Sequence, residues 1–132
     1  MNEGLVGRRI LLVEDELLVA WMLEDMLANR GCIVVGPAAC VDQALELIEA
    51  EIVDAAVLDV SLDHELSYPI ADVLVARGIP FLFSTGYDQD RLREDYRSFP
   101  MLQKPFHPTE LVEVLAALLV ATKPRGGVAA RA

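Results

Sequence analysis

Four short, largely apolar runs in this chain each lead directly into polar residues. The four pairs are residues 10–13 with Glu14 and Asp15, residues 55–58 with Asp59, residues 81–83 with Ser84 and Thr85, and residues 101–103 with Lys104. Parallel strands that are buried on both faces read as nearly continuous apolar runs. In an open α/β sheet the ligand site lies outside the carboxyl ends of the strands. We therefore expect acids, hydroxyls and an amine to gather at one edge of a sheet.

Segments with helical periodicity alternate with these runs, which is the pattern of a parallel sheet covered by helices. The expected strands are residues 9–14, 32–36 and 54–59, a strand that starts at Pro80, and residues 101–103. The expected helices are residues 16–29 and 41–50, a helix from Pro69 to Gly78, a weakly patterned helix within 88–97, and a last helix from Pro108. A polar loop is expected at residues 61–67. The sequence therefore predicts an α/β protein with a parallel five-stranded sheet.

Length and composition limit the class of protein. The 132 residues, 54% of them apolar, predict one globular domain at 1–132, with a core at about 8–121 and a short disordered tail at 122–132. The net charge of −10 argues against binding to nucleic acid or to an anionic membrane, because both need a basic surface. Acidic residues interrupt the first apolar run, so no signal or membrane helix is expected and the protein is predicted to be cytoplasmic.

Several single residues have simple structural interpretations. Cys32 and Cys40 lack metal-site spacing and are expected to be small, buried or partly buried thiols. His107 stands at the N-cap position of the last helix, and His64 lies in the polar loop, where simple exposure is expected. Trp21 lies among apolar residues of the first helix and is expected to pack inside the protein.

Asp59 is the residue with the most specific chemistry. A carboxylate can act as a nucleophile and form an aspartyl phosphate. Two anions repel as they approach, so the reaction needs a divalent cation nearby. Glu14 and Asp15 would hold this cation together with Asp59, because Mg²⁺ prefers oxygen ligands. The backbone carbonyl of Ser61 is a candidate for a further ligand.

Thr85 and Lys104 complete the predicted site. A phosphoryl group gains charge on its outer oxygens during transfer, and fixed donors that point at them stabilise it. Lys104 offers a compact cation and Thr85 offers a hydroxyl group, while Gly86 leaves room for the backbone to approach. Each signal alone has an ordinary explanation, such as a helix N-terminus, a turn or a surface lysine. Their occurrence in this order, each after an apolar run, favours a functional site.

On these residues the chain resembles the response regulator receiver domain over about residues 8–120. The resemblance implies a flavodoxin-like, doubly wound (βα)5 fold with strand order 2-1-3-4-5. It implies that Asp59 accepts a phosphoryl group, with Mg²⁺ or Mn²⁺, from a sensor histidine kinase or a histidine phosphotransfer protein. By the same resemblance, Glu14 and Asp15 match the metal-binding acids, and Thr85 and Lys104 match the switch hydroxyl and the phosphate-binding lysine.

The match is closer to one subgroup of single-domain receivers. Residues 81–87 are similar to the "FATGUY" motif of that subgroup, and residues 101–106 also resemble it. The chain departs from the wider family in residues 60–65, which lack the usual Met-Pro or Leu-Pro and glycine. Met101 also replaces the Tyr or Phe that many receivers place three residues before the lysine. A conformational change near Thr85 and Gly86 would then have to signal that the domain is phosphorylated. Tyr87 is a candidate to take part in this change.

The leading hypothesis is a stand-alone receiver that signals by protein–protein contact, by phosphorelay or as a phosphate sink, and is not a turnover enzyme for external substrates. The downstream partner and the oligomeric state are left open. A second hypothesis is a phosphatase of the haloacid dehalogenase type. Such enzymes typically carry an aspartate two positions after the nucleophile, where this chain has Ser61. A third hypothesis is a degenerate receiver that binds partners without phosphorylation, although such chains usually lose one of the residues that are present here.

Overall fold

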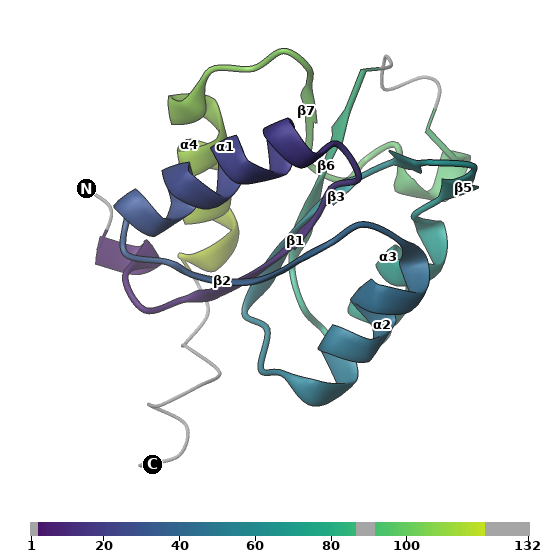
Figure 1. Cartoon of the computed structure of the whole chain (residues 1–132), viewed down its shortest axis with the longest axis horizontal. Coiled ribbons are helices and arrows are strands. Elements are labelled where there is room, and N and C mark those ends of the chain that lie inside the picture. The colour runs from purple at the N-terminus through teal and green to yellow at the C-terminus, as the bar shows by residue number, and fades with distance from the viewer. Residues whose placement is uncertain (1–2, 87–91, 121–132) are drawn as a thin grey trace.

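The computed structural model describes residues 3–86 and 92–120 (Figure 1). Its main sheet has five parallel strands in the order β2-β1-β3-β6-β7. These strands are β1 (Arg9–Val13), β2 (Ile33–Ala38), β3 (Ala55–Asp59), β6 (Phe81–Thr85) and β7 (Met101–Gln103). The α-helices are α1 (Leu17–Asn29), α2 (Val41–Ala50), α3 (Tyr68–Ala76) and α4 (Pro108–Leu119). The described residues also contain two short 3-10 helices, η1 (Glu3–Leu5) and η3 (Glu94–Tyr96), each of which contributes a buried side chain to the core.

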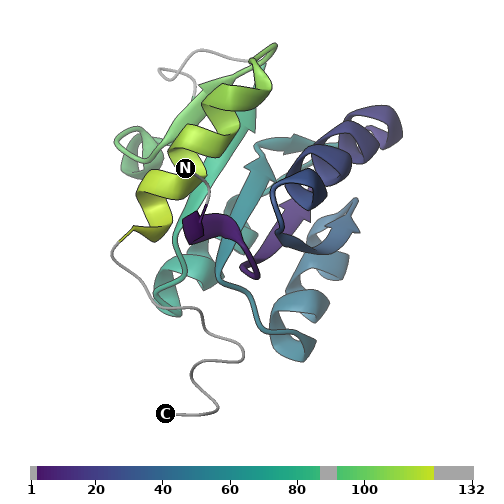
Figure 2. The ribbon, with the colours of Figure 1, turned by 90° about the vertical axis from the view of Figure 1, so that its left-hand side faces the viewer.

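The fold confirms the predicted flavodoxin-like architecture. With β6 and β7 counted as the fourth and fifth parallel strands, the order is the expected 2-1-3-4-5. Helices α1 and α4 cover one face of the sheet, and α2 and α3 cover the other (Figures 1 and 2). Within residues 3–86 and 92–120, none of the helices is long and apolar enough to cross a membrane.

The central strands are buried on both faces, which explains their unbroken apolar sequences. Every residue of β3 and of β6 is buried. Along β1, Ile10 and Leu12 pack toward α1 and α4, whereas Leu11 and Val13 pack toward α2 and α3. The two-residue period of a strand therefore supplies both core layers from one run of sequence.

The predicted start of the last helix is confirmed in detail. The Thr109 N–H donates to Nδ1 of His107 at 3.2 Å, and the His107 N–H donates to Oε1 of Glu110 at 2.7 Å. This reciprocal capping box satisfies donors that a helix N-terminus otherwise leaves unpaired. In α3, Pro69 is the second helical residue, where its missing N–H costs no helical hydrogen bond.

Two expectations between β3 and β7 need correction. The predicted polar loop at 61–67 contains an antiparallel hairpin, β4 (Ser61–Leu62) with β5 (Glu65–Leu66), because buried Leu62 holds its first strand in the core. The predicted helix within 88–97 is, in its described part, only the 3-10 turn η3. Residues 87–91, including Tyr87, and the tail from residue 121 lie outside the described residues.

The prediction that Trp21 packs inside the protein is wrong, since its side chain is 55% exposed. The buried residues of α1 are Ala20, Leu23 and Leu27, which recur at helical spacing on one stripe. Trp21 lies about 100° around the helix from Ala20. The helix has a second, exposed apolar face, formed by Leu17, Leu18, Trp21 and Met22.

Candidate functional site

The polar ends of four strands meet at one edge of the sheet, as the sequence predicts. Strand β1 pairs with β3, β3 pairs with β6, and β6 pairs with β7, all in parallel, so their carboxyl ends point the same way. Glu14 directly follows β1, Asp59 ends β3, Thr85 ends β6 and Lys104 directly follows β7. The strand ends therefore place these four side chains from distant parts of the sequence at one site.

Three carboxylates form the centre of the site. One carboxylate oxygen from each of Glu14, Asp15 and Asp59 lies within 4.8 Å of the others. Glu14 is 3% exposed and Asp59 is 7% exposed, whereas Asp15 is half-buried. Clustered carboxylates repel one another, and hard divalent cations such as Mg²⁺ and Mn²⁺ bind such oxygen donors. The donor set therefore fits a divalent cation.

Lys104 joins two of these acids. Its Nζ donates a hydrogen bond to Oε1 of Glu14 at 2.9 Å and to Oδ2 of Asp59 at 3.1 Å. The Lys104 backbone N–H donates to the Thr85 carbonyl at 2.7 Å, which holds the base of the side chain beside β6. The peptide bond from Lys104 to Pro105 is cis. The ammonium group thus neutralises part of the negative charge around Asp59.

A hollow of about 330 Å³ opens over these groups, lined by Asp15, Glu16, Asp59, Ser61, Thr85, Gly86 and Lys104. The Ser61 N–H donates to Oδ1 of Asp59 at 3.3 Å, and Thr85 is only 1% exposed. The structure thus brings all six predicted site residues together, because Glu14, the sixth, contacts Lys104. The assignment of the Ser61 carbonyl as a metal ligand stays a prediction.

Burial and charge shift two pKa values at the site. Burial raises the pKa of Glu14 above its ordinary value, and the neighbouring charge of Asp59 adds to this, while the hydrogen bond from Lys104 partly offsets it. Burial by itself would lower the pKa of Lys104, but the hydrogen bond to Glu14 and the charges of Asp59 and Glu14 outweigh it and raise the pKa. The direction for Glu14 agrees with the repulsion expected among clustered carboxylates.

Residues 10–116 match the family model described as the response regulator receiver domain. The chain belongs to this family. Receiver domains belong to two-component signalling and act as phosphoacceptors, not as enzymes that turn over substrates. They accept the phosphoryl group from histidine kinases or phosphotransfer proteins, and they bind Mg²⁺ at an acidic pocket.

Solved structures and curated relatives agree with this family. The solution structure of SdrG from Sphingomonas melonis Fr1 has 43% sequence identity and a TM-score of 0.75, covering 86% of this chain and 97% of that one. PhyR from Brucella abortus has 31% identity and a TM-score of 0.77, covering 87% of this chain and 49% of that one. The transcriptional regulatory protein PdtaR of Mycobacterium tuberculosis is 30% identical over 117 residues, which are 86% of this chain and 57% of PdtaR. This receiver domain thus spans about half the length of the curated relatives it matches.

Sequence reasoning missed one contact to the acids of this receiver domain. The backbone N–H of Asp63, at the turn of the β4–β5 hairpin, donates to Oδ2 of Asp15 at 2.8 Å. The turn has only two residues between its paired strands, and His64 there has a positive φ of 60°. The two-residue polar turn at residues 63–64, between Leu62 and Glu65, is the signal that could have identified the hairpin.

An aromatic cluster beside β6 was also missed. The Tyr96 ring from η3 packs edge-on against Phe83 with ring centroids 5.4 Å apart, and its hydroxyl donates to Oδ1 of Asp72 at 2.7 Å. Arg93 stacks over the rings of Tyr68 and Tyr96 and pairs with Asp72. Met101 itself is half-buried against this core. In this receiver domain η3, not the position of Met101, therefore brings an aromatic ring next to β6.

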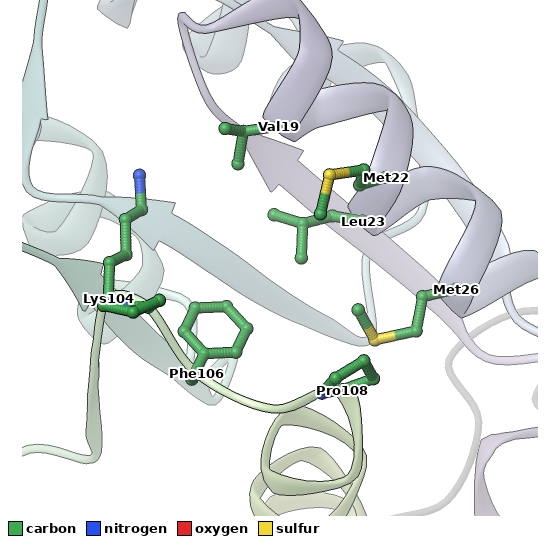
Figure 3. A pocket seen from close by; sticks show the side chains of 8 residues that line it. Val19, Met22, Leu23, Met26, Lys104, Phe106 and Pro108 are labelled. Carbon is green, nitrogen blue, oxygen red and sulfur yellow. The ribbon is translucent and has the colours of Figure 1, made fainter.

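A second, apolar hollow of about 410 Å³ lies between α1 and the connection from β7 to α4 (Figure 3). It is lined by Val19, Met22, Leu23, Met26, Lys104, Pro105, Phe106 and Pro108. The Lys104 side chain lies at one end of this groove and also lines the acidic hollow. Lys104 therefore borders both the groove and the carboxylate site, and Met22, which lines the groove, is 66% exposed. Trp21, on the same helix, is exposed but does not line the groove.

Proposed function

We propose that Asp59 is the phosphoacceptor of this receiver domain. The observation that carries this proposal is the position of its carboxylate, which lies at the end of β3, beside two further acids and in contact with the ammonium group of Lys104. One Asp59 oxygen faces Lys104 and the other accepts the Ser61 N–H. The carboxylate is therefore oriented and partly neutralised before a phosphoryl donor arrives.

The reaction is a phosphoryl transfer from a histidine of the donor protein. A carboxylate oxygen of Asp59 attacks phosphorus, the bond between phosphorus and the histidine nitrogen breaks, and that nitrogen keeps the electron pair. The product is an acyl phosphate on Asp59 and a free imidazole on the donor. The contact between Lys104 and Asp59 has to loosen, so that the ammonium group can move onto a phosphoryl oxygen.

We propose that Glu14, Asp15, Asp59 and the carbonyl of Ser61 hold Mg²⁺ or Mn²⁺. When bound, the cation would offset the negative charge of the phosphoryl group as it approaches the carboxylate. Thr85, in the wall of the hollow, would donate its hydroxyl to another phosphoryl oxygen. Its fixed position at the end of β6 supports this role, because fixed donors stabilise charge without reorganisation.

We propose that the donor protein, a histidine kinase or a histidine phosphotransfer protein, docks its apolar surface in the groove along α1. The groove ends at Lys104, so a protein seated there has its reactive histidine near the acidic hollow. The exposed Trp21 and Met22 would bury apolar area against it. The phosphorylated receiver domain would then signal by protein–protein contact, pass the phosphoryl group on in a phosphorelay, or act as a phosphate sink.

The test is intact mass spectrometry after incubation with a small acyl phosphate, with and without Mg²⁺. The wild type should gain one phosphoryl group only when Mg²⁺ is present, and Asp59→Asn should gain none. Asp63→Asn is the matched control, because this exposed acid is close in sequence and should leave the adduct intact.

Two other outcomes would contradict the proposal. Catalytic turnover of a chromogenic phosphate ester would favour a phosphatase of the haloacid dehalogenase type. Absence of any adduct in the wild type, together with no response to beryllofluoride, would favour a receiver that binds partners without phosphorylation. A relative with 45% identity, SdrG from Pseudomonas melonis Fr1, has a solution structure in a BeF3-activated conformation, which makes beryllofluoride a suitable probe.

A further inference from the structure

The β4–β5 hairpin stands between the carboxylate site and helix α2. It follows Asp59 after one residue and is held in place by Leu62, which is completely buried, and by the Ser67 N–H, which donates to the Val60 carbonyl at 2.9 Å. Its turn at Asp63 and His64 is exposed. The base of the hairpin is therefore fixed, while its tip depends on contacts with other segments.

Two hydrogen bonds hold the rest of the hairpin, and they come from different parts of the chain. At the turn, the Asp63 N–H donates to Oδ2 of Asp15 at 2.8 Å. In β5, Oε2 of Glu65 accepts the Val41 N–H at 3.0 Å. The hairpin thus connects the N-terminus of α2 with the carboxylate of Asp15.

The contact made by Glu65 replaces a missing helix cap. Helix α2 begins at Val41, and its N-cap residue Cys40 makes no side-chain hydrogen bond to the helix. The N-terminus of a helix leaves N–H groups unpaired and attracts negative charge. The N-terminus of α2 therefore stabilises the position of the Glu65 carboxylate, and this contact anchors β5 to the helix.

We propose that Glu65 is a positioning residue for the divalent-cation site. By anchoring β5 to α2, it holds the Asp63 N–H against Oδ2 of Asp15 and so fixes the orientation of this carboxylate beside Glu14 and Asp59. The inference rests on the proposed role of Asp15 as a metal ligand. It goes beyond that role because Glu65 would act only through the hairpin, without touching the cation.

The test compares Mn²⁺ affinity, measured by paramagnetic resonance of the free ion, in the wild type, Glu65→Ala and Glu65→Gln. Loss of the anchor should weaken Mn²⁺ binding about three- to tenfold in Glu65→Ala, less than is typical for a residue bonded directly to a ligand. Glu65→Gln should keep most of the affinity, because its amide oxygen can still accept the Val41 N–H. Glu46→Ala, which removes an exposed charge from α2 itself, is the matched control and should bind Mn²⁺ like the wild type.

A second measurement needs no metal. Hydrogen exchange of the Asp63 amide, followed by NMR, should accelerate in Glu65→Ala and stay slow in Glu65→Gln, while the remaining spectrum reports that the fold is kept. Equal loss of affinity in the alanine and glutamine variants would show an effect of charge alone and overturn the inference. Unchanged affinity in Glu65→Ala would overturn it as well. If the wild type itself binds no Mn²⁺, the proposed function fails together with it.

Discussion

At the scale of single residues, the balance of charge around Lys104 decides how the site behaves. Its ammonium group is the partner of both Glu14 and Asp59, and these two acids are almost completely buried. Removing one partner of a buried ion pair leaves the other charge without compensation, which costs more than the pair contributes. The metal-free protein should therefore depend on Lys104 for stability as well as for phosphoryl binding.

Lys104→Ala should lower the free energy of unfolding of the metal-free protein by about 1–2 kcal/mol. Saturating Mg²⁺ should recover much of this loss, because the cation can replace the missing positive charge. Urea unfolding followed by circular dichroism, with Mg²⁺ and with a chelator, measures both effects. An equal loss with and without Mg²⁺ would contradict this account of the charge balance.

The same variant has a predicted pH dependence. The pKa of Lys104 is raised above its usual value of 10.5, so the folded state holds the proton more tightly than the unfolded chain does. The stabilisation by its charge is therefore complete below 10.5 and is lost as the pH rises through the higher folded-state pKa. The difference in unfolding free energy between the wild type and Lys104→Ala should stay constant through neutral pH and shrink in alkaline solution.

The two thiols should differ in reactivity, because burial raises the pKa of Cys32 to about 11, while Cys40 is partly exposed. The thiolate is the reactive form, so a raised pKa slows alkylation. Iodoacetamide at mildly alkaline pH should label Cys40 first, and Cys32 only after unfolding. Peptide mass spectrometry identifies the labelled site, and faster labelling of Cys32 in the folded protein would show that this part of the core opens readily.

At the scale of elements, helix α1 has two apolar faces, one buried against the sheet and one exposed. Leu23 is 3% exposed and packs between the sheet and α4, whereas Trp21 is 55% exposed. The sequence of α1 is apolar on nearly every side, so periodicity alone did not distinguish these faces, and this explains the wrong prediction for Trp21. Only the position of α1 on the sheet decides which stripe is buried.

Leu23→Ala should therefore cost about 2–4 kcal/mol of stability, and Trp21→Ser should change it by less than about 0.5 kcal/mol. Trp21→Ser should also be phosphorylated normally by a small acyl phosphate, but more slowly by a donor protein that phosphorylates the wild type. Thermal unfolding and phosphorylation rates measure these effects. Equal rates with the protein donor would show that the exposed face of α1 is not the docking surface.

In the connection from β6 to β7, contacts with residues distant in the sequence determine the structure, and local sequence periodicity does not reveal them. The prediction of a helix within 88–97 relied on weak local periodicity, and the described part forms η3 instead. Tyr96 of η3 and its N-cap residue Arg93 contact side chains of distant elements, namely the rings of Phe83 and Tyr68 and the carboxylate of Asp72. Such long-range pairings leave no signal in a single sequence, whereas the N-cap position of His107 is a local feature and was predicted correctly.

At the scale of the whole molecule, the sheet explains why so much of the site could be predicted. A polar residue at the end of a buried parallel strand, or directly after it, lies at the carboxyl edge of the sheet. The positions of Glu14, Asp59, Thr85 and Lys104 therefore follow from the strand positions alone. The strand order came from the family resemblance, and the sheet confirms it. The hairpin contact to Asp15 was not predictable, because it depends on the three-dimensional path of residues 61–66.

With a net charge of −10, the protein is also expected not to bind DNA at physiological salt.

The central claim is that Asp59 itself carries the phosphoryl group, and the most direct measurement maps the adduct to a residue. Borohydride reduces an acyl phosphate to the alcohol, so a phosphorylated aspartate becomes homoserine, while free carboxylates stay unchanged. After treatment with acyl phosphate and Mg²⁺, reduction and digestion, peptide mass spectrometry should find homoserine at position 59 and at no other acid. Homoserine at position 14, 15 or 63, or an unreduced phosphate on a hydroxyl such as that of Thr85, would contradict the account.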